Sequence, residues 1–311
     1  MKNFVDINTI DRPSELINQA IQLKKDPFQF SAIGNHKTLV MLFFNASLRT
    51  RLSTEKAAKN LGMEVMILNV GDSWNLEFDD GVIMNLAKAE HIKDAANVIS
   101  QYADIIAVRA FAGLVDKDKD ALELVLNGFM KYATVPIVNM ESAVAHPLQA
   151  LADAITIEEL KMNKKPKVVI SWAPHPKALP HAVANSFVSM MRSIDVELVI
   201  THPEGYELNP EITKDTPIYF SQEEALVDAD FVYVKNWSNY NDYGKILNKN
   251  HNWMMTQRKL GDAKFMHCLP VRRNVVVEDE VLDGDNSLVI HQANNRTFAA
   301  QIVLKKILEN L

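Results

Sequence analysis

Nine short apolar runs, spread along the whole chain, constrain the fold of this sequence most strongly. Runs such as Val168-Val169-Ile170 are continuously apolar, which is typical of strands buried on both faces of a parallel sheet. The predicted strands are Thr38–Phe44, Glu64–Asn69, Asp104–Arg109, Pro136–Met140, Lys167–Trp172, Glu197–His202, Asp230–Lys235, Ala263–His267 and Ser287–His291. The intervening patterns predict helices at Arg51–Leu61, His91–Tyr102, Asp116–Tyr132, Leu148–Leu160, Leu179–Arg192 and Gln222–Val227. This alternation predicts an α/β protein with two doubly wound parallel sheets.

The length of 311 residues suits two domains of about 150 residues each. The polar stretch Lys161–Pro166 follows a predicted helix, and we expect the domain boundary near residue 150, around that helix. Residues 1–150 then form the first domain and residues 151–311 the second. A last helix at about 294–311 is expected to pack back on the first domain.

Charge and composition exclude several classes of function. The net charge is −6 and no long basic run occurs, which disfavours a nucleic-acid partner. The apolar stretches are far too short to span a membrane, and the N-terminus does not resemble a signal peptide. Cys268 is the only cysteine, so a reducing cytoplasm is the expected location. The nine histidines show no metal-ligand spacing, and we predict no metal. His181 lies in no motif and is expected at the surface.

Polar side chains with chemical potential follow nearly every predicted strand. In open α/β sheets, ligands bind beyond the carboxyl ends of the strands, so these side chains are candidates for one site. In chain order they are Arg49, Trp74, Arg109, Glu141 with His146, His175, His202, Lys235, Cys268 and Arg296. Residues scattered over a surface would not follow this order.

The segment Ser47-Leu48-Arg49-Thr50-Arg51 lies between the first strand and the first predicted helix. Backbone N–H groups at a helix start have no partner within the helix and favour an anion. Two hydroxyls and a guanidinium beside them would make such a site selective for phosphate. The simpler alternative is a serine-capped helix with solvated arginines.

Three further motifs are His146-Pro147-Leu148-Gln149, His267-Cys268-Leu269-Pro270 and Asn295-Arg296. Together with the first loop and Arg109, the chain resembles the carbamoyltransferases over essentially its full length. Cys268 stands where aspartate carbamoyltransferases have proline, which favours the ornithine branch. A Ser-Met-Gly segment that binds free ornithine is absent, and Lys235 in that region would repel an α-ammonium group. The resemblance is therefore greatest to the N-acylornithine carbamoyltransferases, of the N-succinylornithine type.

This resemblance implies roles for individual residues toward carbamoyl phosphate. It assigns Ser47, Leu48, Arg49, Thr50 and Arg109 to the phosphate. Trp74 would reach the phosphate of a neighbouring subunit. His146 and Arg296 would donate to the carbonyl oxygen, while Gln149 and the backbone carbonyls of Cys268 and Leu269 would orient the carbamoyl NH2. His267 is expected to be a structural hydrogen-bonding residue, and no residue is assigned as a base.

The resemblance also implies an acceptor site. Lys235 would bind the α-carboxylate, Glu141 the amide N–H, and His175 and Arg272 the acyl tail. At the position of Ala89, a glutamate goes with acetyl acceptors and a proline with succinyl ones. Alanine repeats neither residue but leaves room for a second carboxylate. N-succinylornithine is therefore the expected acceptor, and N-acetylornithine remains the alternative.

The family also implies a homotrimer, in which Trp74 and the Ala89 loop reach a neighbour, and a knotted path in the second domain. It uses no cofactor. Two other classes remain to be tested. An NAD-dependent oxidoreductase would share the strand pattern, but no Gly-x-Gly-x-x-Gly follows a strand. A catalytically silent paralogue would be expected to lose one of the phosphate arginines, and all are present.

Overall fold

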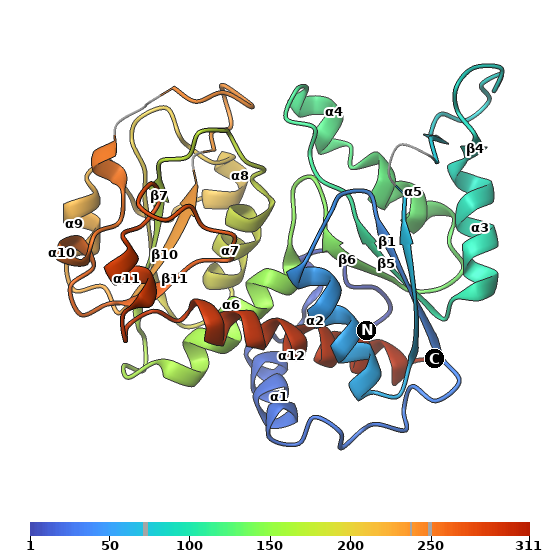
Figure 1. Cartoon of the computed structure of the whole chain (residues 1–311), viewed down its shortest axis with the longest axis horizontal. Helices are drawn as coiled ribbons and strands as arrows, with labels where there is room; N and C mark the ends of the chain where they lie inside the picture. The colour runs from blue at the N-terminus through green and yellow to red at the C-terminus, as the bar shows by residue number, and fades with distance from the viewer. Residues whose placement is uncertain (71–73, 237, 248–250) are drawn as a thin grey trace.

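Two parallel sheets organise the computed structural model of the chain (Figure 1), which describes residues 1–311 except 71–73, 237 and 248–250. The strand order is β2-β1-β5-β6 in one sheet and β11-β10-β7-β8-β9 in the other. Every strand pairing within these two sheets is parallel. The predicted α/β class with parallel sheets is therefore confirmed.

The first sheet is covered by helices on both faces. Leu39 and Met41 of β1 belong to one apolar cluster with Ala57 of α2, whereas Val40 and Leu42 belong to another with residues of α3 and α5. This alternation follows from the two-residue period of a strand. The strands are β1 (Thr38–Phe43), β2 (Glu64–Asn69), β5 (Ile105–Arg109) and β6 (Ile137–Glu141), and a separate short pair is formed by β3 (Leu76–Glu77) and β4 (Glu90–His91). The helices are α1 (Pro13–Lys25), α2 (Arg49–Asn60), α3 (Ile92–Tyr102), α4 (Lys117–Ala121) and α5 (Leu124–Tyr132), preceded by a short 3₁₀ turn at Ile7–Thr9.

The second sheet has Trp172 at its centre, fully buried and donating its indole N–H to the carbonyls of Tyr206 and Ser238. Its strands are β7 (Lys167–Ala173), β8 (Glu197–Thr201), β9 (Ile218–Tyr219), β10 (Phe231–Asn236) and β11 (Lys264–Met266). Its helices are α7 (Ala182–Arg192), α8 (Pro210–Thr213), α9 (Gln222–Leu226), α10 (Gln257–Leu260) and α11 (Asp279–Asp283), with a 3₁₀ turn at His251–Trp253.

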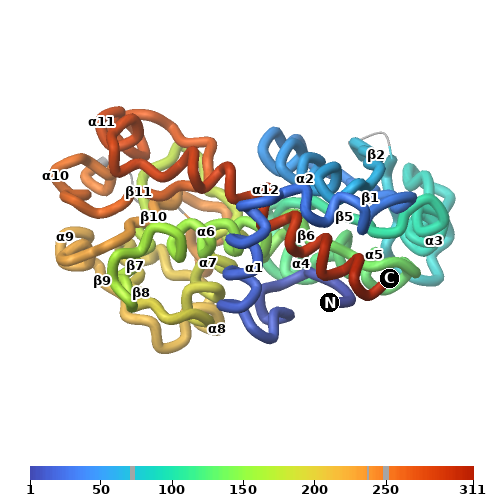
Figure 2. Tube along the Cα trace, turned by 90° about the horizontal axis from the view of Figure 1, so that it is seen from below, coloured from blue at the N-terminus to red at the C-terminus, as the bar shows by residue number. Residues whose placement is uncertain are grey.

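Two long helices, α6 (Pro147–Leu160) and α12 (Val289–Leu308), join the two sheets. The C-terminal helix runs from the second sheet to the first and packs against α1, α2 and α6 (Figure 2). Asn60 of α2 and Gln301 of α12 form a buried hydrogen bond of 2.9 Å at this contact. The largest apolar cluster contains side chains from both sheets and both long helices, so the sheets share one continuous core.

The structure corrects two predicted elements and adds a helix that was not predicted. Ser287–His291 is not a strand: only Ser287 bridges Phe265, and α12 begins at Val289, because burial there follows a helical period with Ile290 exposed. The single helix predicted at Asp116–Tyr132 breaks into α4 and α5 at Glu123, whose φ of 45° is left-handed. The added helix is α1, which was not predicted although its buried residues Leu16, Ile17, Ala20 and Leu23 form a helical stripe.

His181 is buried, contrary to the expectation that it lies at the surface. It precedes α7, is 6% exposed, and packs edge to face on Tyr243 at 5.6 Å between ring centres. Burial lowers its pKa to about 4, because a charged imidazolium would lose its hydration there. In the unfolded chain the ordinary pKa near 6.5 applies, so the unfolded state binds protons first as the pH falls.

We therefore predict that His181 makes the protein less stable below about pH 6.5. The fall of the pKa from 6.5 to about 4 corresponds to roughly 3 kcal/mol of stability, lost progressively between pH 6.5 and 4. Urea denaturation at pH 7.5 and 5.0 should show a smaller acid loss in His181→Asn than in the wild type. The exposed His36→Asn variant is the matched control and should lose as much stability as the wild type. Equal acid losses in all three proteins would contradict this assignment.

Candidate active site

The carboxyl ends of β1, β5, β6, β7, β10 and β11 surround one cavity of about 270 Å³. Four of its lining residues carry a positive charge, namely Arg49, Arg109, Lys235 and Arg296, and one, Glu141, carries a carboxylate. The formal excess is three positive charges among the residues that line this cavity. Such a cavity favours ligands with several negative charges.

Helix α2 begins at this cavity without a side-chain cap. Its N-cap residue is Leu48, which makes no capping hydrogen bond, so the serine-capped alternative is wrong. Asn45 accepts a hydrogen bond of 2.6 Å from the backbone N–H of Phe111, which ties this loop to the segment after β5. Ser47, Arg49 and Thr50 line the cavity beside the helix start. The first N–H groups of α2 are thus available to an anion.

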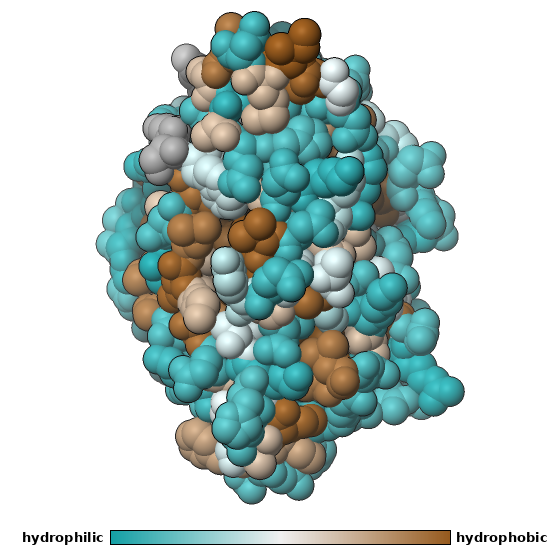
Figure 3. All heavy atoms as spheres, turned by 90° about the vertical axis from the view of Figure 1, so that its right-hand side faces the viewer, coloured by the Kyte–Doolittle hydropathy of each residue, from teal (hydrophilic) through white to brown (hydrophobic). Residues whose placement is uncertain are grey.

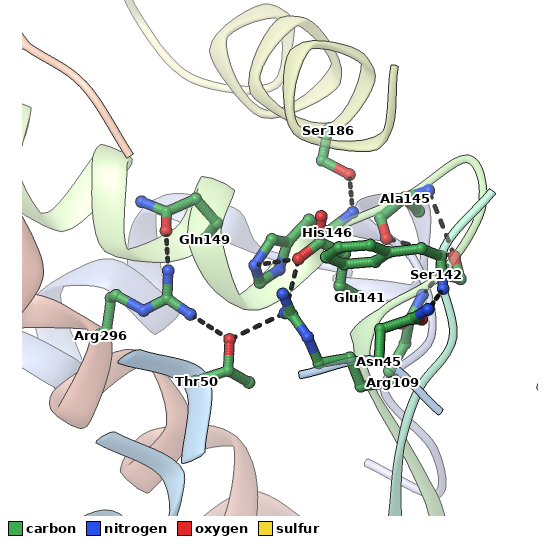
Figure 4. Close-up of polar contacts among 12 residues, drawn as sticks. Asn45, Thr50, Arg109, Glu141, Ser142, Ala145, His146, Gln149, Ser186 and Arg296 are labelled. Atoms are coloured by element: carbon green, nitrogen blue, oxygen red, sulfur yellow. Dashed lines mark hydrogen bonds and ion pairs between the residues drawn. The ribbon is translucent and has the colours of Figure 1, made fainter. Parts of the chain in front are cut away.

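Two buried guanidinium groups converge on the hydroxyl of Thr50 (Figure 4). Arg109 at the end of β5 donates to Thr50 Oγ1 at 2.9 Å, and Arg296 of α12 donates to the same oxygen at 2.6 Å. The Nε atoms of both arginines are buried without a hydrogen-bond partner in the described part of the chain. Burial, and then the charge of Arg109, lowers the pKa of Arg296 to about 10. Both groups remain cations at neutral pH and are poised for an additional anion.

Glu141 is the one carboxylate among the residues that line this cavity. Its Oε2 lies 2.6 Å from Arg109 NH1 and 3.3 Å from His146 Nε2. Burial raises the pKa of Glu141, whereas the charges of Arg109, Arg296 and Lys235 oppose that rise. Burial, with the same three cations, lowers the pKa of His146 well below its usual value. His146 is therefore neutral at physiological pH and can donate one N–H.

The opposite wall comes from the second sheet. Lys235 lies near the end of β10, and Cys268 and Leu269 follow β11. Arg272 donates its Nε–H to His175 Nε2 at 3.1 Å, and His175 Nδ1 lies 2.7 Å from the carbonyl oxygen and 3.1 Å from the backbone nitrogen of Lys177. His267 accepts a hydrogen bond of 2.8 Å from the backbone N–H of Leu269, which confirms its structural role.

Most of the predicted site residues meet in this cavity. Its lining includes Ser47, Arg49, Thr50, Arg109, Glu141, His146, Gln149, His175, Lys235, Cys268, Leu269 and Arg296. Leu48, Trp74, Ala89 and Arg272 are not among the lining residues. Leu48 is largely exposed, and Arg272 is connected to the cavity only through His175.

Trp74 and Ala89 lie apart from the cavity, in the segment around β3 and β4. Trp74 donates its indole N–H to Glu90 at 2.8 Å, and the backbone N–H of Ala89 donates to the carbonyl of Asn75 at 2.8 Å. Residues 71–73, which precede Trp74, lie outside the described residues. Within this chain the two residues therefore contribute nothing to the cavity lining.

The sequence reading missed several residues of the lining. Phe111, whose ring lies 4.4 Å from the guanidinium carbon of Arg109, follows β5 by two residues and so obeys the strand-end rule that found its neighbours. Asn236 ends β10 and obeys the same rule. Leu179, Pro180, Val183 and Pro270 are apolar lining residues with no polar signal.

Among the helices that the structure describes, none combines the length and the apolar character that a membrane span requires.

Comparison with known proteins agrees with this geometry. Residues 2–159 match the family model "Aspartate/ornithine carbamoyltransferase, carbamoyl-P binding domain", and residues 180–307 match "Aspartate/ornithine carbamoyltransferase, Asp/Orn binding domain". The chain is 47% identical to N-succinylornithine carbamoyltransferase of Bacteroides thetaiotaomicron, with all of both chains covered. It is 34% identical to N-acetylornithine carbamoyltransferase of Xylella fastidiosa, with 98% of each chain covered.

Solved structures give the same result. A glutamate-to-alanine variant of N-acetyl-L-ornithine transcarbamylase, complexed with carbamyl phosphate and N-succinyl-L-norvaline, matches with a TM-score of 0.91. The sequences are 30% identical, and the match covers 99% of this chain and all of the other. Taken together, the two matched domains, the full-length relatives and the cationic cavity show that this chain belongs to the aspartate/ornithine carbamoyltransferase family and is a carbamoyltransferase.

Proposed function

We propose that the protein transfers the carbamoyl group of carbamoyl phosphate to the δ-amine of N-succinyl-L-ornithine, which gives N-succinyl-L-citrulline and phosphate in arginine biosynthesis. The observation that carries this proposal is the convergence of Arg109 and Arg296 on Thr50 at the open start of α2. The 47% identity to an N-succinylornithine carbamoyltransferase supports the choice of acceptor.

The phosphate would bind at the start of α2, held by Ser47, Arg49, Thr50 and Arg109, with Leu48 contributing its backbone. These cations would neutralise the charge that grows on the leaving phosphate as its bond to carbon breaks. Phosphate carries between one and two negative charges near neutral pH, and the formal excess of three positive charges in the cavity matches a substrate of this kind. No side chain caps the first N–H groups of α2, so a phosphate would not have to displace one.

The carbamoyl group would lie between His146, Arg296 and Gln149. Neutral His146 and the guanidinium of Arg296 would donate to the carbonyl oxygen, on which negative charge develops when the amine attacks. Gln149 and the backbone carbonyls of Cys268 and Leu269 would accept from the carbamoyl NH2. The new C–N bond forms as the C–O bond to phosphate breaks, and the departing phosphate takes the proton of the amine. Alignment of the two bound substrates supplies much of the acceleration, up to roughly 7–11 kcal/mol.

The acceptor would bind against the second sheet. Lys235 would pair with its α-carboxylate, and Glu141 would accept from its amide N–H. The linked pair His175 and Arg272 lies on the same side and would face the carboxylate of a succinyl tail. N-acetyl-L-ornithine is the second candidate acceptor, because solved structures of acetylornithine transcarbamylase match this chain closely.

We also propose that the active form is a cytoplasmic homotrimer without a cofactor or metal. Apolar side chains are exposed on the side of the molecule where α3 and β4 lie (Figure 3). They include Met66, Leu68, Val82, Ile83, Met84, Leu86, Val98 and Tyr102. Exposed apolar side chains gathered on one side of the molecule suit contact with a neighbouring subunit. Trp74 and the Ala89 loop would then complete the site of that neighbour.

Residues 1–150 would form the carbamoyl phosphate-binding domain and residues 151–311 the acylornithine-binding domain. Both sheets would be doubly wound, with the last helix, α12, belonging to the first domain by its packing against α1 and α2. The chain path of the second domain would be knotted near the proline-rich segment before α7.

A citrulline-product assay tests the proposed function. We expect turnover with carbamoyl phosphate and N-succinyl-L-ornithine, a lower rate with N-acetyl-L-ornithine, and little with ornithine, whose α-ammonium group would face Lys235. Strong turnover of free ornithine would refute the role of Lys235. No product from any of the three acceptors would refute the function itself and favour a catalytically silent protein.

Arg49→Ala should reduce kcat/KM by several orders of magnitude, because a phosphate-binding cation at the open start of α2 is lost. Arg51→Ala is the matched control on the same helix, since Arg51 contacts Asn69 and the ring of Phe43 and does not line the cavity. Steady-state kinetics with melting temperatures should show a folded Arg49 variant and a control near wild type. Activity of Arg49→Ala within about tenfold of wild type, or ~1.4 kcal/mol of barrier, is incompatible with the assigned role.

Ala89→Glu should shift the preference from succinyl to acetyl acceptors. The introduced carboxylate would repel the carboxylate of a succinyl tail but not an acetyl group. The ratio of kcat/KM for the two acceptors measures this shift, and Ala89→Gln controls for the size of the side chain. If the ratio does not differ between the two variants, Ala89 has no part in selectivity.

A further inference from the structure

A buried carboxylate that the proposed mechanism does not use lies directly behind the cavity. Asp153 of α6 is fully buried, and its Oδ1 accepts hydrogen bonds of 2.6 Å from Gln149 Nε2 and of 2.6 Å from Gln292 Nε2. Gln149 lies in the first turn of α6, whereas Gln292 comes from α12. One oxygen atom therefore connects two glutamines that are distant in sequence.

The other partners of the two glutamines fix the direction of their amides. Arg296 donates to Gln149 Oε1 (Figure 4), and a guanidinium has no acceptor, so the amino group of Gln149 must face Asp153. The backbone N–H of His267 donates to Gln292 Oε1 at 3.1 Å, so the amino group of Gln292 must also face Asp153. Both amides require an acceptor at this position and would be mismatched with a donor.

These two amide orientations determine what the cavity offers to a carbamoyl group. Gln149 lines the cavity, and with its amino group directed to Asp153 its oxygen is left to accept from the carbamoyl NH2. Gln292 accepts from the backbone N–H of His267, and the imidazole Nδ1 of His267 accepts from the backbone N–H of Leu269. These two hydrogen bonds fix the segment whose carbonyls would face the same NH2. If the side-chain amide of Gln149 were reversed, its NH2 would face the carbamoyl NH2, and two donors cannot form a hydrogen bond.

Asp153 can accept hydrogen bonds from both glutamines whether or not its carboxyl group is protonated. Burial raises its pKa to about 7, although Gln292, Gln149 and the nearby Tyr233 side chain oppose that rise. Oδ2 makes no hydrogen bond of its own among the residues described. A proton on Oδ2 would leave Oδ1 free to accept from both glutamines. An amide side chain, with one oxygen and one NH2, would imitate this protonated form. The required property is thus an acceptor atom and not a negative charge.

We propose that Asp153 is a positioning residue for carbamoyl transfer, which through Oδ1 keeps Gln149 and Gln292 in the orientation that presents acceptors to the carbamoyl NH2. This inference rests on the proposed function, because it assumes that a carbamoyl group occupies the cavity. Asp153 itself contacts no substrate and acts through the two glutamines.

Variants that keep, oppose or remove the acceptor atom of Asp153 test the proposal. Asp153→Asn keeps an acceptor oxygen, so its kcat should stay within about tenfold of wild type. Gln149→Glu places a carboxylate oxygen against the oxygen of Asp153, so kcat should fall about 100-fold or more. Asp153→Leu removes the acceptor atom, so the amino groups of both glutamines lose their partner and both amides can turn. Its kcat should therefore fall about 100-fold or more relative to Asp153→Asn.

Two measurements separate positioning from a general structural role. Calorimetric affinity for inorganic phosphate should change by less than about threefold in Asp153→Asn and Asp153→Leu, because the phosphate contacts do not involve Asp153. Thr156→Val is the matched control, since Thr156 lies one turn along α6 in a buried polar contact with Asn295, away from the cavity lining. Its kcat should remain within about threefold of wild type even if its melting temperature falls.

A folded Asp153→Leu with kcat within about tenfold of wild type overturns the proposal, as does a folded Asp153→Asn that loses more than about 100-fold in kcat. A loss of kcat in Asp153→Leu that does not occur in Asp153→Asn, with unchanged phosphate affinity in both variants, supports it. A wild-type protein that forms no product from any acceptor refutes the proposed function, a failure that is distinct from an unaffected Asp153→Leu.

Discussion

The site depends on two guanidinium groups that are held in a buried space and share one hydroxyl. Arg109 and Arg296 both donate to Thr50 Oγ1, and each has little contact with water. Two like charges at such proximity are unfavourable unless a counter-charge is near. Glu141 supplies one negative charge, and the cavity still has an excess of cations. The arrangement therefore carries an electrostatic cost in the ligand-free protein that a bound polyanion would relieve.

Burial and the same excess of positive charge together keep a histidine of the cavity uncharged. His146 is surrounded by Arg296, Arg109 and Lys235, and with burial these cations lower its pKa well below the usual range. An imidazolium at this position would add a fourth cation. A neutral imidazole instead offers one N–H donor without increasing the repulsion. The cations that favour a phosphate thus add to the effect of burial in keeping His146 uncharged.

Much of the sheet architecture and the polar lining could be predicted, because both follow from local sequence rules. Parallel strands bring their carboxyl ends to one edge, so Arg109 at the end of β5 and Lys235 near the end of β10 could be placed by sequence position alone. The strand prediction was wrong at Ser287–His291, because this short apolar run leads into the long helix α12. Periodicity over five residues does not separate a strand from a helix start. It also missed apolar lining such as Leu179, which has no chemical signal.

What sequence reasoning could not find is the layer of contacts behind the lining. Asp153 lies in the middle of α6 among apolar neighbours, and nothing in its local pattern distinguishes it from a solvated acid. Its partner Gln292 is 139 residues away, and their contact depends on how α12 crosses α6. The hydrogen-bonding chemistry of donor-only groups then makes the network directional, because Arg296 and the backbone of His267 leave each glutamine one orientation. The cationic lining accounts for the attraction of a charged substrate, whereas the orientation of its uncharged carbamoyl end depends on buried amides that the sheet topology alone does not specify.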